Sequence, residues 1–358
     1  MIGFTLLATL IAAVAARSLP VRHGSHSIAA RSALPSSFTW TSTQALVGPK
    51  DDNRPIDGIK DPSIIEINGT YHVFASTASD AEGYNMLYFN FTDFEKAGDA
   101  PFFYLDQAPL GTGYRAAPEV FYFEPQSLWY LVYQDGNAAY STNPDISNPA
   151  GWTAPEHFYS GTPALIEAGL EGGYWVDMWV VCDATDCHLF SSDDNGRLYR
   201  SQTPIGDFPK GMNEPVIALE EASKYDLFEA STIYSIGNGT YLTLVECIGA
   251  NGRYFRSWTS PSIAGPYTPL ADTEANPFLG LNNVEFPTGT RWSKSISHGE
   301  LIRTNVDQNL YVEPCNFRFL YQGVDPEVEG SGGSYNALPW KLALVTQTNS
   351  ECSNATMH

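Results

Sequence analysis

The chain has 358 residues, and its 40 acidic residues against 19 Lys and Arg give a formal charge of −21 and a pI near 4.5. A surface with that charge repels nucleic acids and anionic membranes, so we expect neither as a partner and expect a neutral ligand instead. The hydrophobic fraction of 43% is enough for a core, and the length lies within the range of one large all-β domain.

The amino-terminal segment reads as a targeting signal. Residues 1–16 carry no charged side chain, are apolar and end in the small residues Val14-Ala15-Ala16. We interpret them as a secretory signal peptide, although a basic segment before the apolar run is missing. A membrane anchor is the alternative, but the run is short for a bilayer span. Residues 17–36 are rich in Ser, Arg, Ala and His, and we expect a flexible leader there.

Sequons and cysteines fit a secreted, extracellular glycoprotein. The glycosylation acceptors would be Asn68, Asn90, Asn238 and Asn354. Cys182 and Cys187 are close enough in the chain to staple a hairpin, and Cys315 and Cys352 could tie down the end of the chain. Cys247 is then left over. We expect it to be a buried free thiol, because it lies in an apolar strand and no Cys-His signature accompanies it.

Short apolar runs alternate with turns throughout, and no 3.6-residue periodicity persists, which indicates an all-β protein. One arrangement, a strand, a tight turn and a second apolar strand, recurs five times at intervals of 52 to 69 residues. The units are DPSIIEINGTYHVFAS from 61, APEVFYFEPQSLWYLVYQ from 117, DMWVVCDATDCHLFSS from 177, EASTIYSIGNGTYLTLVEC from 229 and HGELIRTNVDQNLYVEP from 298. Five small antiparallel sheets of this kind predict a five-bladed β-propeller.

The two ends of the chain are expected to meet in the last blade. A closing strand is predicted over 340–346, and the segment 38–47 would add a further strand and so complete the ring. The predicted organisation is a single propeller domain over 37–352, followed by a tail of residues 353–358. We expect the protein to act as a monomer.

In a propeller the first strand of each blade lines the central channel, so the first residues of the five units would meet at one end of it. These residues are Asp61, Ala117, Asp177, Glu229 and His298. Two facing carboxyl groups can hydrolyse a glycosidic bond, one as a protonated acid and the other as an ionised base. Strands on different blades favour a wide pair, which leaves room for water and inverts the anomeric centre. A third carboxylate would raise the pKa of the acid by repulsion.

Simpler interpretations stand beside this one. The acids could merely begin strands, or could form a structural or Ca²⁺-binding cluster. One histidine is not a metal signature, so a hydrogen-bonded core residue is the default for His298. Trp129, Trp175 and Trp179 could stack on sugars, but burial is the default for each of them. The sequence has no HExxH motif, P-loop or Rossmann glycine pattern.

Several motifs, taken together and in order, resemble those of glycoside hydrolase family 62 over about Ser37 to Cys352. They are KDPSI (60–64), GYWVDMWV (173–180), YDLFEAS (225–231), SISHGE (295–300) and SYNALPWKL (334–342). Members of that family are secreted α-L-arabinofuranosidases with a five-bladed propeller fold, and they release arabinofuranose side groups from arabinoxylan by inversion. The resemblance therefore implies an exo-acting, inverting α-L-arabinofuranosidase, with arabinan as a second candidate substrate.

The resemblance also implies residue roles. Asp61 would be the general base and Glu229 the general acid, while Asp177 would tune the acid and orient the substrate. His298 is expected near a Ca²⁺ ion that is bound largely through water.

Four further residues would contact the substrate by the same resemblance. Lys60 and Tyr335 are expected against the arabinose, with Asn336 and Arg115 as further candidates. A β-xylosidase or endo-arabinanase of the related propeller family is the alternative enzyme, because it would share the acid trio and the fold. A carbohydrate-binding propeller without catalysis is the alternative outside the enzymes.

Overall fold

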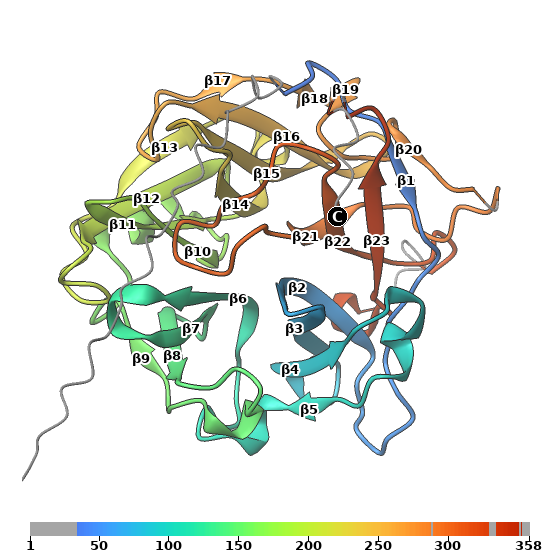
Figure 1. Cartoon of the computed structure of the whole chain (residues 1–358), viewed down its shortest axis with the longest axis horizontal. Coiled ribbons are helices and arrows are strands. Elements are labelled where there is room, and N and C mark those ends of the chain that lie inside the picture. Colours follow the sequence, from blue (N-terminus) through green and yellow to red (C-terminus); the bar gives the residue numbers. More distant parts are fainter. Residues whose placement is uncertain (1–33, 288, 329–333, 351, 353–358) are drawn as a thin grey trace, which may run out of the picture. The chain divides into compact units, whose positions relative to one another are not determined.

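The computed structural model describes residues 34–287, 289–328, 334–350 and 352. In this part of the chain, strands form five sheets arranged around a common axis as the blades of a propeller (Figure 1). The predicted all-β, five-bladed propeller is thus confirmed. The expected signal peptide (1–16), residues 17–33 of the leader, Asn354 and the tail of 353–358 lie outside the described residues.

Blades 1 to 4 are antiparallel sheets whose strands follow one another in chain order from the axis outward, whereas blade 5 also contains a parallel pair, β1 and β20. Blade 1 consists of β2 (Gly58–Ile67), β3 (Thr70–Ser79), β4 (Gly83–Phe91) and β5 (Phe103–Tyr104). Blade 2 consists of β6 (Ala116–Phe123), β7 (Leu128–Gln134), β8 (Ala138–Asn143) and β9 (Glu156–His157). Blade 3 consists of β10 (Val176–Cys182), β11 (Asp186–Ser192), β12 (Arg197–Pro204) and β13 (Val216–Glu220). Blade 4 consists of β14 (Glu229–Ser235), β15 (Tyr241–Gly249), β16 (Gly252–Ser260) and β17 (Thr268–Pro269).

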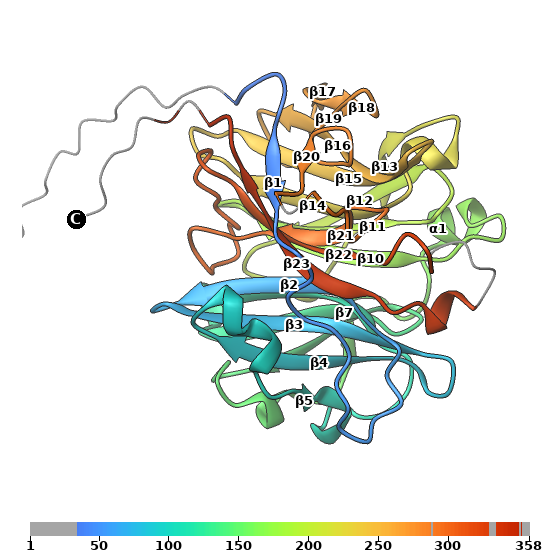
Figure 2. The same ribbon diagram turned by 90° about the vertical axis from the view of Figure 1, so that its right-hand side faces the viewer.

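Blade 5 joins the two ends of the described chain. From the axis outward it contains β21 (Ser297–Leu301), β22 (Arg318–Gly323), β23 (Lys341–Gln347), β1 (Trp40–Ser42) and β20 (Val284–Glu285). β1 pairs antiparallel with β23 through Thr41 and Thr346, as expected, and Figure 2 shows the blue β1 along the red β23. The buried Trp40 indole also donates to the Phe278 carbonyl at 2.7 Å. Ring closure therefore rests on strand pairing and on a buried aromatic anchor.

The remaining elements are short. β18 (Asp272–Thr273) and β19 (Asn276–Pro277) form a hairpin, and α1 (Ala164–Gly169) is a single helical segment. The 3₁₀ segments are η1 (Phe94–Asp99), η2 (Leu105–Gln107), η3 (Glu124–Gln126), η4 (Pro149–Gly151), η5 (Lys224–Asp226) and η6 (Tyr335–Ala337). Among the described residues, the helices are all too short or too polar to cross a membrane.

The covalent cross-links match the sequence expectation. Disulfides join Cys182 to Cys187 and Cys315 to Cys352, and Cys247 is a buried free cysteine. Burial raises the pKa of the Cys247 thiol to about 12, so it is not a nucleophile at neutral pH.

The first hairpin shows how local sequence sets the register. β2 and β3 pair up to Ile67 and Thr70, which leaves Asn68 and Gly69 as a two-residue turn. Their φ angles of 51° and 79° are those of a type I′ turn, which an Asn-Gly pair adopts at little cost. Asn68 is exposed at this turn, as are Asn90 and Asn238 elsewhere in the described chain.

Inner strands are buried on both faces because each blade lies between two others. β3, for example, is buried at every position after its first. Ile65 and Phe74 of blade 1 belong to one cluster with Leu131 and Tyr133 of blade 2. Double burial explains why the sequence shows continuous apolar runs where a half-exposed strand would alternate.

All five innermost strands share one irregularity, which is a β-bulge near the start of the strand. The register shifts lie between Lys60/Ser63, Ala116/Glu119, Val176/Trp179, Glu229/Thr232 and Ser297/Gly299. At each bulge one backbone N–H loses its partner within the blade and donates to a side chain of the preceding blade instead. The donor and acceptor pairs are Asp61 and Gln322, Ala117 and Ser76, Asp177 and Gln134, Ala230 and Asp177, and His298 and Glu246.

A second layer of interblade hydrogen bonds lies further along the same strands. Its donor and acceptor pairs are Ile64 and Glu300, Val120 and Ser63, Val180 and Glu119, and Leu301 and Tyr234. The fully buried Arg303 pairs with Glu300 at 2.6 Å and donates to the Val120 carbonyl. The two layers clamp the innermost strands to one another around the axis.

The interblade hydrogen bonds at the five bulges should contribute measurably to the free energy of unfolding. Gln322→Leu removes the acceptor of the Asp61 N–H, and a buried unsatisfied N–H costs about 1–3 kcal/mol. We expect the free energy of unfolding in urea to fall by that amount. Gln107→Leu, at an exposed position of η2, is the matched control and should change the free energy of unfolding by less than about 0.5 kcal/mol. Equal stability of the two variants would contradict a structural role for this layer.

Candidate active site

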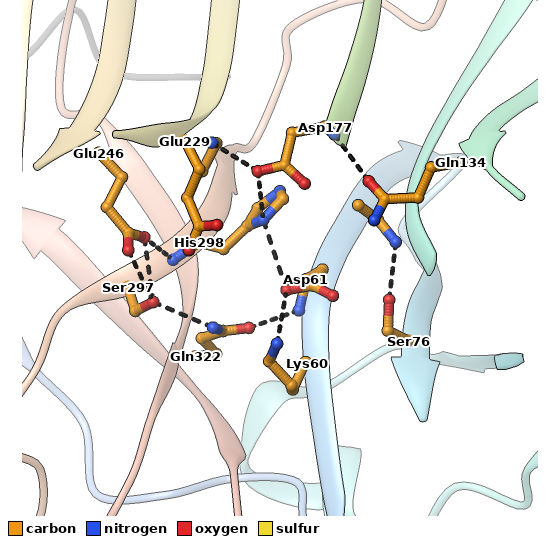
Figure 3. Close-up of polar contacts among 12 residues, drawn as sticks. Lys60, Asp61, Ser76, Gln134, Asp177, Glu229, Glu246, Ser297, His298 and Gln322 are labelled. Atoms are coloured by element: carbon orange, nitrogen blue, oxygen red, sulfur yellow. Dashed lines mark hydrogen bonds and ion pairs between the residues drawn. The ribbon is translucent and has the colours of Figure 1, made fainter. Parts of the chain in front are cut away.

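The bulges turn two aspartates toward the axis. Asp61 on β2 and Asp177 on β10 have φ angles of 47° and 57°, a left-handed conformation that costs a residue with a Cβ about 1–2 kcal/mol. Ala117 and Ala230 take the same conformation at the equivalent positions of β6 and β14. Both carboxyl groups face the space between the innermost strands (Figure 3). Strain that recurs at charged, inward-facing residues is typical of functional sites.

The structure corrects the alignment of the units in blade 4 by one residue. Glu229 pairs with Glu246 across β14 and β15, just as Lys60 pairs with Ser76 across β2 and β3. The residue equivalent to Asp61 is therefore Ala230, and Glu229 is the counterpart of Lys60. The structure still brings Glu229 to the cluster, because the Ala230 N–H donates to Asp177 at 2.6 Å.

His298 lies between the two aspartates. Its Nδ1 is 3.4 Å from Asp61 Oδ1 and 3.7 Å from Asp177 Oδ2 (Figure 3). The His298 backbone N–H is held by Glu246, which also accepts hydrogen bonds from the Ser297 hydroxyl. The structure therefore unites Asp61, Asp177, Glu229 and His298, while Ala117 contributes a small side chain to the same ring.

Lys60 is buried among aromatic rings beside the first aspartate. Its Nζ lies 3.7 Å from Asp61 Oδ1, and 4.9 to 5.8 Å from the ring centroids of three aromatic residues. Those residues are Tyr84, Tyr335 and Trp340. Burial is the largest single influence and lowers the pKa of Lys60. The charges of Asp61 and, to a smaller extent, of Tyr335, Tyr84 and Glu229 together outweigh it, so the pKa ends well above its ordinary value. The lysine is thus a fixed cation, stabilised by cation–π contacts as well as by the carboxylate.

The two aspartates differ in protonation. Burial raises the pKa of Asp61. Lys60, His298, a hydrogen bond from Ser76 and Arg253 together outweigh burial, and the pKa falls below its usual value. Burial raises the pKa of Asp177 as well, and repulsion from Glu229 and Asp61 adds to it, so that pKa lies well above its usual value. The two pKa shifts have opposite signs, which favours the ionised form of Asp61 and the protonated form of Asp177, the division of labour that acid–base catalysis needs.

Glu229 has a cationic partner that the sequence analysis missed. Arg253, at the start of β16, contacts the carboxylates of both Glu229 and Glu246 through Nη1. Glu246 is fully buried, and its pKa is raised by burial despite this contact with Arg253. Arg253 thus holds the Glu229 and Glu246 carboxyl groups next to each other.

Asp194 is a fourth carboxyl group of the cluster, and the sequence analysis missed it as well. It lies in the turn between β11 and β12, has a φ of 54°, and hydrogen-bonds to the Glu229 side chain. Burial, followed by repulsion from Glu229 and Asp177, raises the pKa of Asp194 to about 9. A protonated Asp194 therefore holds its proton beside the Glu229 carboxyl group.

The other sequence candidates are spread more widely. Tyr335 is 42% exposed above Lys60, and Asn336 follows it in η6. Arg115 donates to the Thr112 carbonyl and lies beside Tyr133, and no hydrogen bond or ion pair among the described residues joins it to the acids. Its neighbour Tyr114 hydrogen-bonds to Gln134, which holds Asp177.

Core packing accounts for the three tryptophans. Trp129, Trp175 and Trp179 are each at most 8% exposed, and the Trp179 indole donates to the Ile233 carbonyl at 3.1 Å.

The site offers few direct ligands for a metal. Within the described residues, no three His, Cys, Asp or Glu side chains are arranged to hold an ion. Nδ1 of His298 faces the two aspartates, which leaves Nε2 as the ring atom for a metal. A cation there would therefore take most of its ligands from water. These residues fit Ca²⁺ only if the ion is coordinated mainly by water molecules.

Comparison with known proteins shows the family. The model of glycosyl hydrolase family 62 matches residues 39–346. Alpha-L-arabinofuranosidase C of Cellvibrio japonicus (strain Ueda107) is 43% identical over 309 residues, which are 86% of this chain and 46% of that protein. The chain thus spans about half the length of this curated relative.

Two solved structures are similar over nearly their whole length. The catalytic domain of a Coprinopsis cinerea family 62 α-L-arabinofuranosidase is 64% identical, with a TM-score of 0.87, covering 89% of this chain and 100% of that one. A family 62 hydrolase in complex with xylotriose is 61% identical, with a TM-score of 0.84, covering 87% and 98%.

The raised pKa of Asp194 should make the thermal stability of the protein depend on pH. The Asp194 carboxyl has a pKa of about 9 in the folded protein and about 4 in the unfolded chain, so the folded state binds its proton more tightly. Between these two values the free energy of unfolding therefore falls as the pH rises. Asp194→Asn removes this pH dependence. We expect the Tm of the variant, relative to wild type, to increase steadily over this window.

Thermal melts from pH 4.5 to 9 make the measurement. Asp207→Asn, at an exposed turn, is the control for loss of one negative charge. A difference between Asp194→Asn and wild type that stays constant or shrinks as pH rises would refute the protonated state of Asp194.

Proposed function

The chain belongs to glycosyl hydrolase family 62, and we propose that it is a secreted, monomeric α-L-arabinofuranosidase that removes side groups from arabinoxylan by inversion. The names of its relatives support the activity: both the Cellvibrio protein and the Coprinopsis domain are α-L-arabinofuranosidases. A related hydrolase bound to xylotriose supports a xylan main chain as the substrate. The acidic surface supports a neutral polysaccharide.

One observation carries the mechanism: carboxyl groups whose pKa values are shifted in opposite directions meet at the axis. Asp61 is kept ionised by Lys60 and His298, as a general base must be. Asp177 and Asp194, whose pKa values are both raised, adjoin Glu229. Glu229 can therefore be supplied with a proton in spite of its contact with Arg253.

The proposed cycle moves two protons. Glu229 gives its proton to the glycosidic oxygen as the bond from that oxygen to the arabinose C1 breaks. Asp61 takes a proton from a water molecule whose oxygen forms the new bond to C1 from the opposite face. Asp177 stays protonated, reduces repulsion within the cluster and orients the sugar. Exchange of protons with solvent, through Asp194 and Asp177, then returns Glu229 and Asp61 to their starting states.

The arabinose would lie against Lys60 and Tyr335. The buried ammonium can donate to sugar hydroxyls, and the half-exposed Tyr335 ring lies directly over it. Asn336 and Arg115 remain candidates for contacts with the neighbouring xylose. Tyr114 is a better-placed candidate than Arg115, because it bonds to Gln134 next to Asp177.

We also propose a Ca²⁺ ion near His298, held by the imidazole and largely by water. It would supply positive charge that keeps Asp61 ionised and fixes the His298 ring. Metal analysis of the purified protein, with and without His298→Ala, tests this assignment.

Export and glycosylation belong to the same proposal. Cleavage near Ala16 would release the chain, and Asn68, Asn90 and Asn238 are exposed on the folded domain, where they would carry the glycans. Amino-terminal sequencing of the exported protein, and its change in mass on deglycosylation, are the measurements.

Incubation with wheat-type arabinoxylan tests the activity. We expect free arabinose and an intact xylan backbone. Glu229→Gln and Asp61→Asn should each lower kcat by about 10²–10⁴-fold, because each removes one of the two proton transfers. Release of xylose or arabino-oligomers would instead identify the related enzyme classes, and binding to xylan without any sugar release would identify a lectin.

The stereochemistry is a separate and sharper test. A water that attacks from the face opposite the leaving group gives β-L-arabinofuranose as the first product. Proton NMR in the first minutes, before mutarotation, distinguishes the anomers. An initial α-anomer would show a covalent intermediate and would remove the general-base role from Asp61.

A further inference from the structure

Glu246 is a fully buried carboxyl group that the proposed reaction does not use. It lies on β15, the second strand of blade 4, where it pairs with Glu229 at the bulge. Ser76, Gln134 and Gln322 occupy the same position on the second strands of blades 1, 2 and 5. Each of these four side chains accepts a backbone N–H of the next blade. A neutral side chain is sufficient for that hydrogen bond in three blades, so the carboxyl group at 246 needs another explanation.

The two oxygens of the Glu246 carboxyl group have different principal partners. Oε2 accepts from the His298 N–H and, at 3.0 Å, from the Ser297 hydroxyl (Figure 3). Oε1 accepts from Nη1 of Arg253, which also contacts the Glu229 carboxyl group. The Ser297 hydroxyl lies 3.2 Å from Oε1 as well. Oε2 therefore completes the interblade hydrogen bond, while Oε1 is the atom that holds Arg253.

The groups around Glu246 all donate to it. The Gln322 amide donates to Ser297 Oγ at 3.0 Å, which leaves the Ser297 hydroxyl hydrogen for Glu246 (Figure 3). The His298 N–H and the Arg253 guanidinium can only donate. A carboxylate accepts from all of these partners, whereas an amide would place a hydrogen against one of them.

Arg253 transmits the position of Glu246 to the proposed acid. Its guanidinium contacts Glu246 on one side and Glu229 on the other, and its Cζ lies 5.4 Å from the centroid of the Phe228 ring. Glu246 is the buried member of this row, because its side chain is fully inaccessible while that of Glu229 is 18% exposed. The guanidinium, and with it the Glu229 carboxyl group, is thus anchored to a buried point of the β-sheet.

We propose that Glu246 is a positioning residue, which holds Glu229 through Arg253 in the orientation that protonates the glycosidic oxygen. A proton donor contributes to catalysis only while its geometry is fixed, and buried partners of the donor supply that geometry. The inference rests on the proposed function, because it presupposes the acid role of Glu229. Glu246 itself is buried and touches no substrate.

Glu246→Gln breaks one contact of this arrangement selectively. The amide oxygen can take the place of Oε2 and keep the His298 N–H, whereas the amide N–H₂ in the place of Oε1 faces the Arg253 guanidinium. Loss of acid positioning is visible in the leaving group: 2,4-dinitrophenol departs without a proton, and unsubstituted phenol needs one.

The test compares these two aryl α-L-arabinofuranosides. We expect Glu246→Gln to lower kcat/KM about 10- to 100-fold on the phenyl substrate and less than about threefold on the dinitrophenyl substrate. Glu285→Gln, at an exposed position of β20, is the matched control and should leave both values unchanged. Glu246→Asp keeps both oxygens and should show a smaller loss with the same preference, and it decides the question should Glu246→Gln fail to fold.

The same assay with Glu229→Gln separates the two proposals. Equal losses on both substrates in a folded Glu246 variant, beside a clear preference in Glu229→Gln, would overturn the positioning role and leave the acid in place. A Glu229→Gln variant that loses the same activity on both substrates would overturn the acid role of Glu229 in the proposed function.

Discussion

The site depends on a backbone N–H that cannot bond within its own blade. At each of the five bulges this N–H donates to a side chain of the preceding blade, and in four of them the donor has a left-handed φ. A bulge without such an acceptor would combine backbone strain with a buried unsatisfied donor. Propeller closure supplies the acceptor, and the bent strand in turn presents the side chain to the axis.

At blade 4 a single side chain, that of Asp177, has both a structural and a chemical role. In the other blades the acceptor is a Ser, a Gln or a Glu on the second strand, but the Ala230 N–H is accepted by Asp177 itself. Asp177 therefore holds the backbone beside Glu229 and also carries a pKa raised by its burial and by its neighbours. Its substitution would disturb geometry as well as charge. Asp194, which approaches Glu229 from another turn, offers a way to change the charge of the cluster with less effect on the clamp.

Much of this arrangement could be predicted from the sequence, since five strand–turn–strand units are visible as continuous apolar runs. The register within a unit could not, because a bulge adds a residue without changing the pattern, and Glu229 was accordingly aligned one residue out of place. Asp194 and Arg253 are not identified from the sequence, because Asp194 lies in and Arg253 directly follows a Gly- and Asn-containing turn that is typical of a plain hairpin. The topology of a propeller blade supplies the rule that locates both residues. The turn between the second and third strands of a blade lies at the same end as the start of the first strand, so its side chains reach the site.

Closure of blade 5 by β1 has a consequence for synthesis on the ribosome. β1 emerges first, but its partner β23 follows about 300 residues later, which at 5–20 residues per second is about 15–60 seconds. Until then blades 1 to 4 can form in order, but the ring has an open side and the exposed edge of β1 is available to other nascent chains. The residence time of that open intermediate, rather than the pairing of any single blade, sets the period during which translation is most vulnerable to misassembly.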